Sequence, residues 1–145
     1  MKIMIEIIPH KNQRYDTAGD WQLDIDPADP DWPKGGELLT IRVSDTGDWK
    51  SNMLVAIHEL AEAVLCKAHG VTGEQVDAWD MGPGRAMKEP GNDHRAPHFN
   101  EHSVAEYIEH ALARELISWP EHEKNLDKLE WKDEKDTGIS HASKR

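Results

Sequence analysis

The chain has 145 residues, a formal net charge of −11 at pH 7 and a single cysteine. This length predicts one domain with its own core. The negative charge argues against nucleic acid or an anionic membrane as a partner, since both bind positive surfaces. We expect neither a membrane span nor a signal peptide, because no run of about 18 apolar residues or cleavage site is present. One cysteine cannot form a disulfide within the chain, which favours a reducing cytoplasm.

Three segments in the N-terminal third alternate apolar and polar residues, as β-strands do: 2–8, 21–25 and 37–44. Pro9 ends the first segment, and the turn-rich stretch 26–36 separates the other two. These segments predict a small antiparallel sheet. With the helices that follow, they predict an α+β fold in which the sheet packs on two main helices within a domain of residues 1–120.

The first main helix is expected from Ser51, as the N-cap, to Gly70, just past the C-terminus. Five apolar residues recur at helical spacing and predict a stripe that must be buried. They are Leu54, Ile57, Ala61, Leu65 and Ala68. Thr72 is the expected cap of a short helix, with Gln75 completing a capping box.

The Gly- and Pro-rich stretch 81–100 is expected to be a loop of the kind that often carries function. Asn100 is the expected N-cap of the second main helix, which stops before Pro120. Residues 121–135 predict a charged C-terminal helix or extension, docked through Leu126 and Leu129, and 136–145 a flexible tail.

The first helix carries the motif His58-Glu59-Leu-Ala-Glu62, or HExxE. His58 and Glu62 are four residues apart and share one face, which is the spacing of a pair of zinc ligands. Zinc accepts carboxylate oxygen as well as imidazole, and a catalytic site has three protein ligands and an open position. His102, on the inward side of the second helix, is the expected third ligand. We therefore predict one Zn²⁺ per chain, with Glu59 as the catalytic general base.

Three acidic residues are candidates to orient these histidines or to act as alternative ligands: Asp77, Asp80 and Glu109. His94 and His98 are alternative third ligands, ranked lower because they lie in the 81–100 loop. The remaining histidines are expected at the surface: His10, His69, His110, His122 and His141. Cys66, one turn beyond Glu62, is expected to be a small buried hydrophobe.

Two other functions compete with a zinc hydrolase. The pairs Glu59-x-x-Glu62 and Glu74-x-x-Asp77 loosely reproduce the carboxylates that bind Mg²⁺ in all-α nucleotide pyrophosphatases of the MazG type. The other alternative is a non-catalytic accessory protein that has a structural metal and binds a host protein.

Several segments resemble a family of short, functionally uncharacterised proteins of tailed bacteriophages and prophages. They are RYDTAGDW (14–21), IRVSDTGDW (41–49), VAIHELAEAVLCKAHGVTGEQVDAWD (55–80), EPGNDHRAPHFNEHSVAEYIE (89–109) and ELISW (115–119). The resemblance implies a phage-encoded protein acting in the host bacterial cytoplasm, and it implies no particular activity. For the hydrolase we expect a peptide or a host protein as the substrate. Strands that lead into an HExx(H/E) helix resemble, more distantly, zincin-like metallopeptidases. Glu62 stands where those enzymes have a second histidine, and its charge weakens the zinc ion as a Lewis acid.

Overall fold

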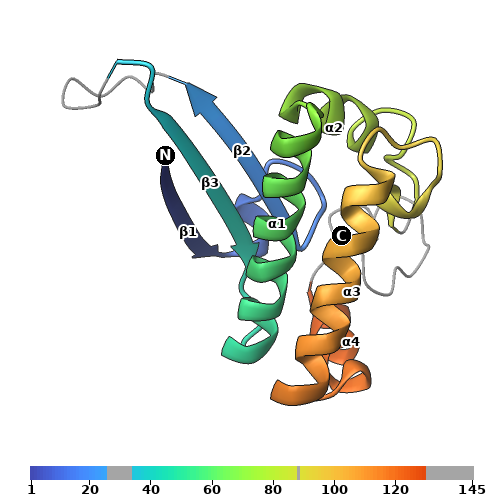
Figure 1. Ribbon diagram of the computed structural model, residues 1–145. Coiled ribbons are helices and arrows are strands. Elements are labelled where there is room, and N and C mark those ends of the chain that lie inside the picture. Colours follow the sequence, from blue (N-terminus) through green and yellow to red (C-terminus); the bar gives the residue numbers. More distant parts are fainter. Residues whose placement is uncertain (26–33, 88, 130–145) are drawn as a thin grey trace.

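A computed structural model describes residues 1–25, 34–87 and 89–129. Its elements are β1 (Lys2–Ile8), η1 (His10–Asn12), β2 (Gly19–Ile25), β3 (Glu37–Ser44), α1 (Trp49–His69), α2 (Gly73–Asp80), η2 (Pro90–Asn92), α3 (Phe99–Leu116) and α4 (Trp119–Asp127). Helix α1 contacts β2 and β3 on one side and α3 on the other, so it lies between the sheet and α3 (Figure 1). The predicted α+β class is confirmed. The predicted tail and the last part of the charged extension, residues 130–135, lie outside the described residues.

The three strands are ordered β1-β3-β2. β2 and β3 pair antiparallel, as expected, but β1 pairs parallel to β3. The prediction of a wholly antiparallel sheet is therefore wrong in this one pairing. Each connection reverses the chain direction, so β1 and β3 run the same way, and β3 lies between β1 and β2.

The core lies between the sheet and the helices. Its side chains come from all three parts of the described chain: Ala18, Trp21, Leu39, Ile41, Val43, Val55, Ala56, Ala63, Cys66, Val76, Leu126 and Leu129. The last two lie in α4 and just after it, so the expected docking of Leu126 and Leu129 is confirmed. None of the helices formed by the described residues has the length and apolar character needed to cross a membrane.

The apolar side chains of β1 share the sheet face that packs on α1, yet they remain exposed. Ile5 pairs with Ile41 in the register, so both lie on the same face. Ile41 is fully buried, whereas Ile5 is 45% exposed. β1 and β2 are both edge strands, but α1 makes its main sheet contacts with β2 and β3, so it does not cover β1.

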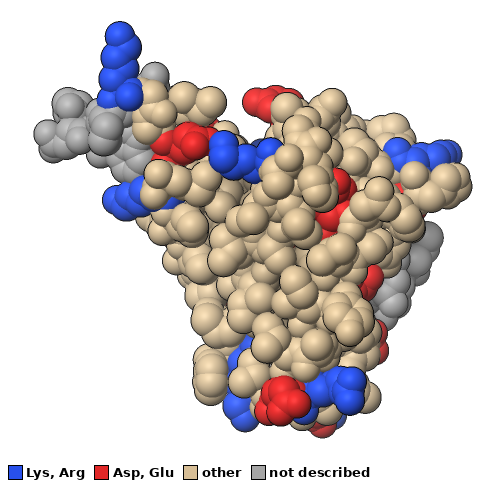
Figure 2. Space-filling view, in the orientation of Figure 1, with Lys and Arg blue, Asp and Glu red and all other residues tan. Residues whose placement is uncertain are grey.

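The apolar stripe predicted on α1 is not the face that α1 buries. Only Leu54 of that stripe is fully buried, and Ala68 is exposed. The helix turns its charged residues inward instead, and its solvent side carries no charge between Lys50 and Lys67. Figure 2 shows that the middle of this face is almost free of charged side chains, which lie toward its upper and lower margins and along its right side.

The helix ends differ from the expected ones at the start of α1 and at both ends of α3. Asp48 caps α1, accepting hydrogen bonds from the backbone N–H groups of Lys50 (2.8 Å) and Ser51 (3.4 Å). The expected cap, Ser51, is one turn inside the helix and buried. Gly70 ends α1 in the left-handed region, with φ 76°, as a glycine at this position can. The Thr72–Gln75 capping box of α2 is confirmed.

The second main helix begins and ends earlier than expected. α3 starts at Phe99 with His98 at the N-cap position, so Asn100 is not the cap. It ends at Leu116, and Ser118 caps α4 by accepting a hydrogen bond from the backbone N–H of Glu121. Pro120 therefore lies in the first turn of a new helix, where its missing N–H costs nothing.

Candidate metal centre

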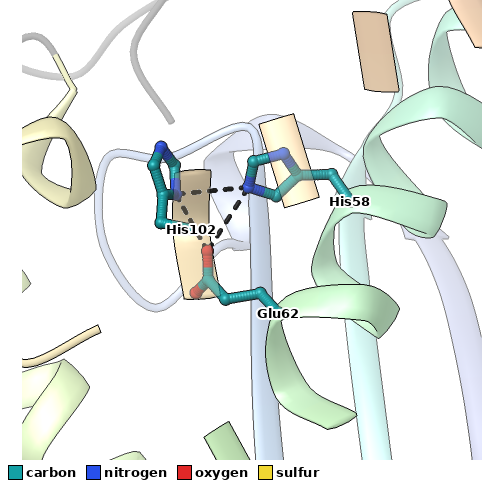
Figure 3. Close-up of side chains that lie close together, drawn as sticks. All are labelled: His58, Glu62 and His102. Atoms are coloured by element: carbon teal, nitrogen blue, oxygen red, sulfur yellow. Dashed lines mark hydrogen bonds and ion pairs between the residues drawn. The ribbon is translucent and has the colours of Figure 1, made fainter. Parts of the chain in front are cut away.

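Three side chains expected to bind zinc meet where α1 and α3 pack together. Helix α1 supplies His58 and Glu62, one turn apart, and the first turn of α3 supplies His102 (Figure 3). All three are buried, with exposures of 1%, 5% and 3%. The backbone at Gly91 lies close to the His102 ring, and only glycine allows this, because a Cβ there would lie 2.5 Å from Cγ of His102.

The three potential ligand atoms are spaced as zinc ligands are. His58 Nε2 lies 3.3 Å from both Glu62 Oε2 and His102 Nδ1. His102 Nδ1 lies 2.9 Å from Glu62 Oε2. Tetrahedral ligands about 2.0–2.1 Å from zinc are about 3.3–3.4 Å apart. Two histidines and one carboxylate are also a ligand set that catalytic zinc sites use, so the residues fit the ion.

A buried carboxylate orients His58, as predicted for Glu109. His58 Nδ1 is 2.8 Å from Glu109 Oε1, and the second oxygen of Glu109 is 2.5 Å from His122 Nε2. On its other side, His122 Nδ1 lies 3.0 Å from Ser51 Oγ, and Ser51 Oγ accepts a hydrogen bond from Asn125 Nδ2. The prediction that His122 lies at the surface is therefore wrong: it is fully buried. A carboxylate on the far nitrogen fixes the ring with Nε2 facing the other ligands.

Glu62 is held by partners on both oxygens. The Trp21 indole N–H donates to its Oε1 at 3.1 Å, and Oε2 faces the two histidines. Burial alone would raise the pKa of Glu62, but the hydrogen bonds with His102 and His58 hold it well below its usual range. Glu62 is therefore the anionic member of the group.

Glu59 differs from Glu62 in having no such partner. Its side chain is 5% exposed and lies against Gly19, where a Cβ would come within 2.6 Å of Oε1. Among the residues that the structure describes, its carboxylate makes no hydrogen bond or ion pair. Burial and the negative charge of Glu62 raise the pKa of Glu59 to about 8. Its oxygens are thus left for a group that enters the site.

A cavity of about 20 Å³ adjoins these residues, enough for roughly one water molecule. Its lining includes Tyr15, Gly19, Asp20, His58, Glu59, Glu62, Asp77, Asp80, His98 and His102. All three residues of the HExxE motif therefore face one small polar cavity.

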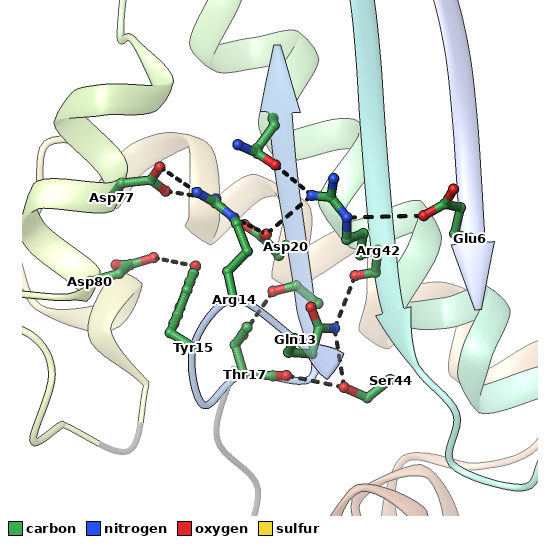
Figure 4. A network of polar contacts seen from close by, with 12 residues as sticks. Glu6, Gln13, Arg14, Tyr15, Thr17, Asp20, Arg42, Ser44, Asp77 and Asp80 are labelled. Atoms are coloured by element: carbon green, nitrogen blue, oxygen red, sulfur yellow. Dashed lines mark hydrogen bonds and ion pairs between the residues drawn. The ribbon is translucent and has the colours of Figure 1, made fainter. Parts of the chain in front are cut away.

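The two aspartates of α2 both line this cavity, but they have different hydrogen-bond partners. Asp77 forms a bidentate ion pair with Arg14, at 3.0 and 3.1 Å, and Arg14 also binds Asp20 (Figure 4). Asp80 instead accepts a hydrogen bond from the Tyr15 hydroxyl at 3.3 Å. Burial and the nearby charge of Glu62 raise the pKa of Asp80 to about 7. Neither aspartate contacts the ligand atoms of the triad directly, whereas Glu109 does contact the His58 ring.

The two loop histidines behave differently. His94 is exposed, but His98 is 2% exposed, with its ring centre 6.1 Å from that of His102. His98 ranks low among the expected ligands because it lies in the stretch that the sequence predicts to be a loop. A usable signal is present in the sequence, because His98 and His102 are four residues apart, the spacing of the His58–Glu62 pair.

The other expectations for single residues have mixed outcomes. The prediction that His10 lies at the surface is wrong: it is buried between Ser44 Oγ (2.8 Å) and Asp16 (3.0 Å). His69 is exposed, His110 stacks on Trp119, and His141 lies outside the described residues. Cys66 is fully buried, which raises its thiol pKa.

Glu74 is exposed and does not line the cavity, so the pairing of Glu59-x-x-Glu62 with Glu74-x-x-Asp77 that a nucleotide pyrophosphatase would need is not formed.

Comparison with protein-family models, with curated proteins and with solved structures finds no match for this chain.

Proposed function

We propose that the protein is a zinc-dependent hydrolase with a peptidase-like HExxE site. The observation that carries this proposal is the Glu59 carboxylate, which is buried beside the triad and has no partner among the described residues. A buried carboxyl group without a hydrogen-bond partner is costly in either protonation state, so such a group is retained where a ligand or a reaction needs it. A purely structural site has no use for it.

Each residue has a role that follows from its position. His58, Glu62 and His102 would hold the ion, which when bound acidifies a coordinated water and polarises a substrate carbonyl. Glu59 accepts the proton of the attacking water and returns it to the leaving group. Glu109 keeps His58 Nε2 directed at the centre. We propose a peptide or host protein as substrate and, from the resemblance to phage proteins, action in the bacterial cytoplasm.

The decisive experiment compares zinc content and hydrolysis in matched variants. Glu59→Gln is expected to keep one zinc per chain and to lose at least about 100-fold in cleavage of a mixed unstructured-peptide substrate. Glu74→Gln, an exposed carboxylate on α2, is the control and is expected to match wild type. Wild-type protein that takes up no zinc on titration would refute the proposal, as would equal cleavage by wild type and Glu59→Gln.

A second candidate function is a non-catalytic accessory protein with a structural metal. It is favoured by the burial of all three ligands and by a cavity that admits only about one water. This function predicts that zinc removal unfolds the chain, whereas Glu59→Gln changes nothing but stability. Thermal unfolding with and without a chelator, together with the cleavage assay, separates the two.

A further inference from the structure

The cavity beside the triad contains a second group of polar atoms that the proposed zinc site does not use. We propose that Asp80 and His98 bind a second divalent cation there, next to the first. The proposed ion is a zinc- or manganese-like cation, because a carboxylate with an imidazole suits these metals. The inference rests on the proposed function, because that site supplies the neighbouring ion.

Two buried atoms in this group have no hydrogen-bond partner among the described residues. They are Asp80 Oδ1 and His98 Nδ1. Buried polar groups are almost always satisfied, and exceptions call for an explanation such as a missing ion or water. Here both exceptions belong to side chains that line one cavity, and the His98 side chain is only 2% exposed. The ring nitrogen of His98 that lies nearest Asp80 is the other one, Nε2, so Nε2 and Asp80 Oδ1 are the atoms that would bind the ion.

The distance between the two side chains is too long for a hydrogen bond but suits a shared ion. His98 Nε2 lies 3.6 Å from Asp80 Oδ1. Atoms bound to one zinc are about 3.3–3.4 Å apart at tetrahedral angles, so a small movement of either side chain completes the pair. The Tyr15 hydroxyl holds the other oxygen of Asp80 at 3.3 Å, which leaves Oδ1 directed away from it.

The charges around the cavity also favour a second cation. Five carboxylates line it: Asp20, Glu59, Glu62, Asp77 and Asp80. Arg14 pairs with Asp20 and Asp77. With all five ionised and the histidines neutral, one divalent ion at the triad balances two of the charges and Arg14 a third, which leaves a net charge of −2. A second divalent ion would cancel these two remaining charges, as the paired ions of two-metal hydrolytic centres do for their ligands.

The test counts zinc ions per chain by equilibrium dialysis and elemental analysis, using the full chain. Wild type is expected to bind two ions. Asp80→Asn and His98→Gln are each expected to bind one, while keeping the far-ultraviolet circular dichroism of wild type. Asp77→Asn is the matched control, because it lies on the same helix and lines the same cavity but is paired with Arg14. It is expected to bind two.

The outcomes separate this inference from the proposed function. Two ions in wild type and one in His58→Gln support both. A single ion in wild type that His58→Gln removes overturns the second site and leaves the zinc site in place. The second site is also overturned if Asp80→Asn and His98→Gln both still bind two zinc ions per chain. It is overturned as well if Asp77→Asn loses as much zinc as those two variants do. No ion in wild type overturns both.

Discussion

Glu109→Gln tests whether the buried carboxylate behind His58 strengthens metal binding or only fills space. Glu109 is fully buried and bridges His58 Nδ1 and His122 Nε2. Glutamine has the same shape, and its amide oxygen can still accept from His58. Its NH₂ group can donate to His122 Nε2 once the proton of that ring moves to Nδ1, which faces Ser51 Oγ. The hydrogen bonds are therefore kept and the negative charge is lost.

The expected effect is a selective loss of zinc affinity. Replacing a carboxylate that orients a ligating histidine costs about 10–100-fold in metal affinity, which is about 1.4–2.7 kcal/mol. Because every buried donor keeps an acceptor, we expect the metal-free variant to unfold within about 1 kcal/mol of wild type. The change in zinc affinity should thus exceed the change in the stability of the metal-free chain.

Competition with a chromophoric chelator measures the zinc affinity, and urea unfolding of the metal-free protein measures the stability. Glu101→Gln is the control, since Glu101 is a buried carboxylate of the same helix that pairs with His69 rather than with the triad. We expect its zinc affinity to match wild type. A zinc affinity of Glu109→Gln within twofold of wild type would refute this reasoning, and so would an equal loss in both variants.

Three further predictions test the fold around the site. Gly91→Ala places a Cβ 2.5 Å from His102 Cγ, so it should cost about 1–3 kcal/mol of stability and weaken zinc binding; unchanged zinc titration would contradict this. Ile5→Lys should change the free energy of unfolding by less than about 0.5 kcal/mol, whereas Ile41→Ala should cost about 2–5 kcal/mol, because only Ile41 is buried; similar urea midpoints would show that the strand faces are misassigned. Asp45 accepts hydrogen bonds from a backbone N–H at 2.9 Å and a side-chain amide at 3.1 Å, and these lower its pKa below 3.8. Its contribution to the free energy of unfolding is therefore present above that pH and is lost on acidification. Asp45→Asn should reduce the change of the urea midpoint with acid pH, and an unchanged pH dependence would contradict this.

The sequence predicts the elements better than it predicts their contacts. Alternation and capping residues are local signals, so the three strands, the end of α1 at Gly70 and the Thr72 capping box follow from them. The parallel pairing of β1 with β3 depends on which strand lies in the middle of the sheet, and alternation carries no such information. The division between α3 and α4 lies earlier than Pro120 predicts, because proline is found both after helices and in their first turn.

The same contrast holds at the candidate site. The i,i+4 spacing within α1 brings His58 and Glu62 together, and the inward position of His102 on the next long helix follows from its apolar neighbours. The burial of His122 could not be predicted, because its partner Glu109 is 13 residues away on another helix. Contacts of this kind depend on how α3 and α4 cross, which no local pattern specifies.

The inverted burial of α1 links the fold to the proposed chemistry. An amphipathic helix of a globular protein usually buries only its apolar side, but α1 buries His58, Glu59 and Glu62 together with its apolar core residues and leaves Val64 49% exposed. Burying three titratable residues on one helix is unfavourable unless each charge is compensated. His58 and Glu62 have partners from β2 and α3, whereas Glu59 has none among the described residues. A cation bound at the triad would compensate the negative charge of Glu62 and Glu59, so metal binding is the property to measure first.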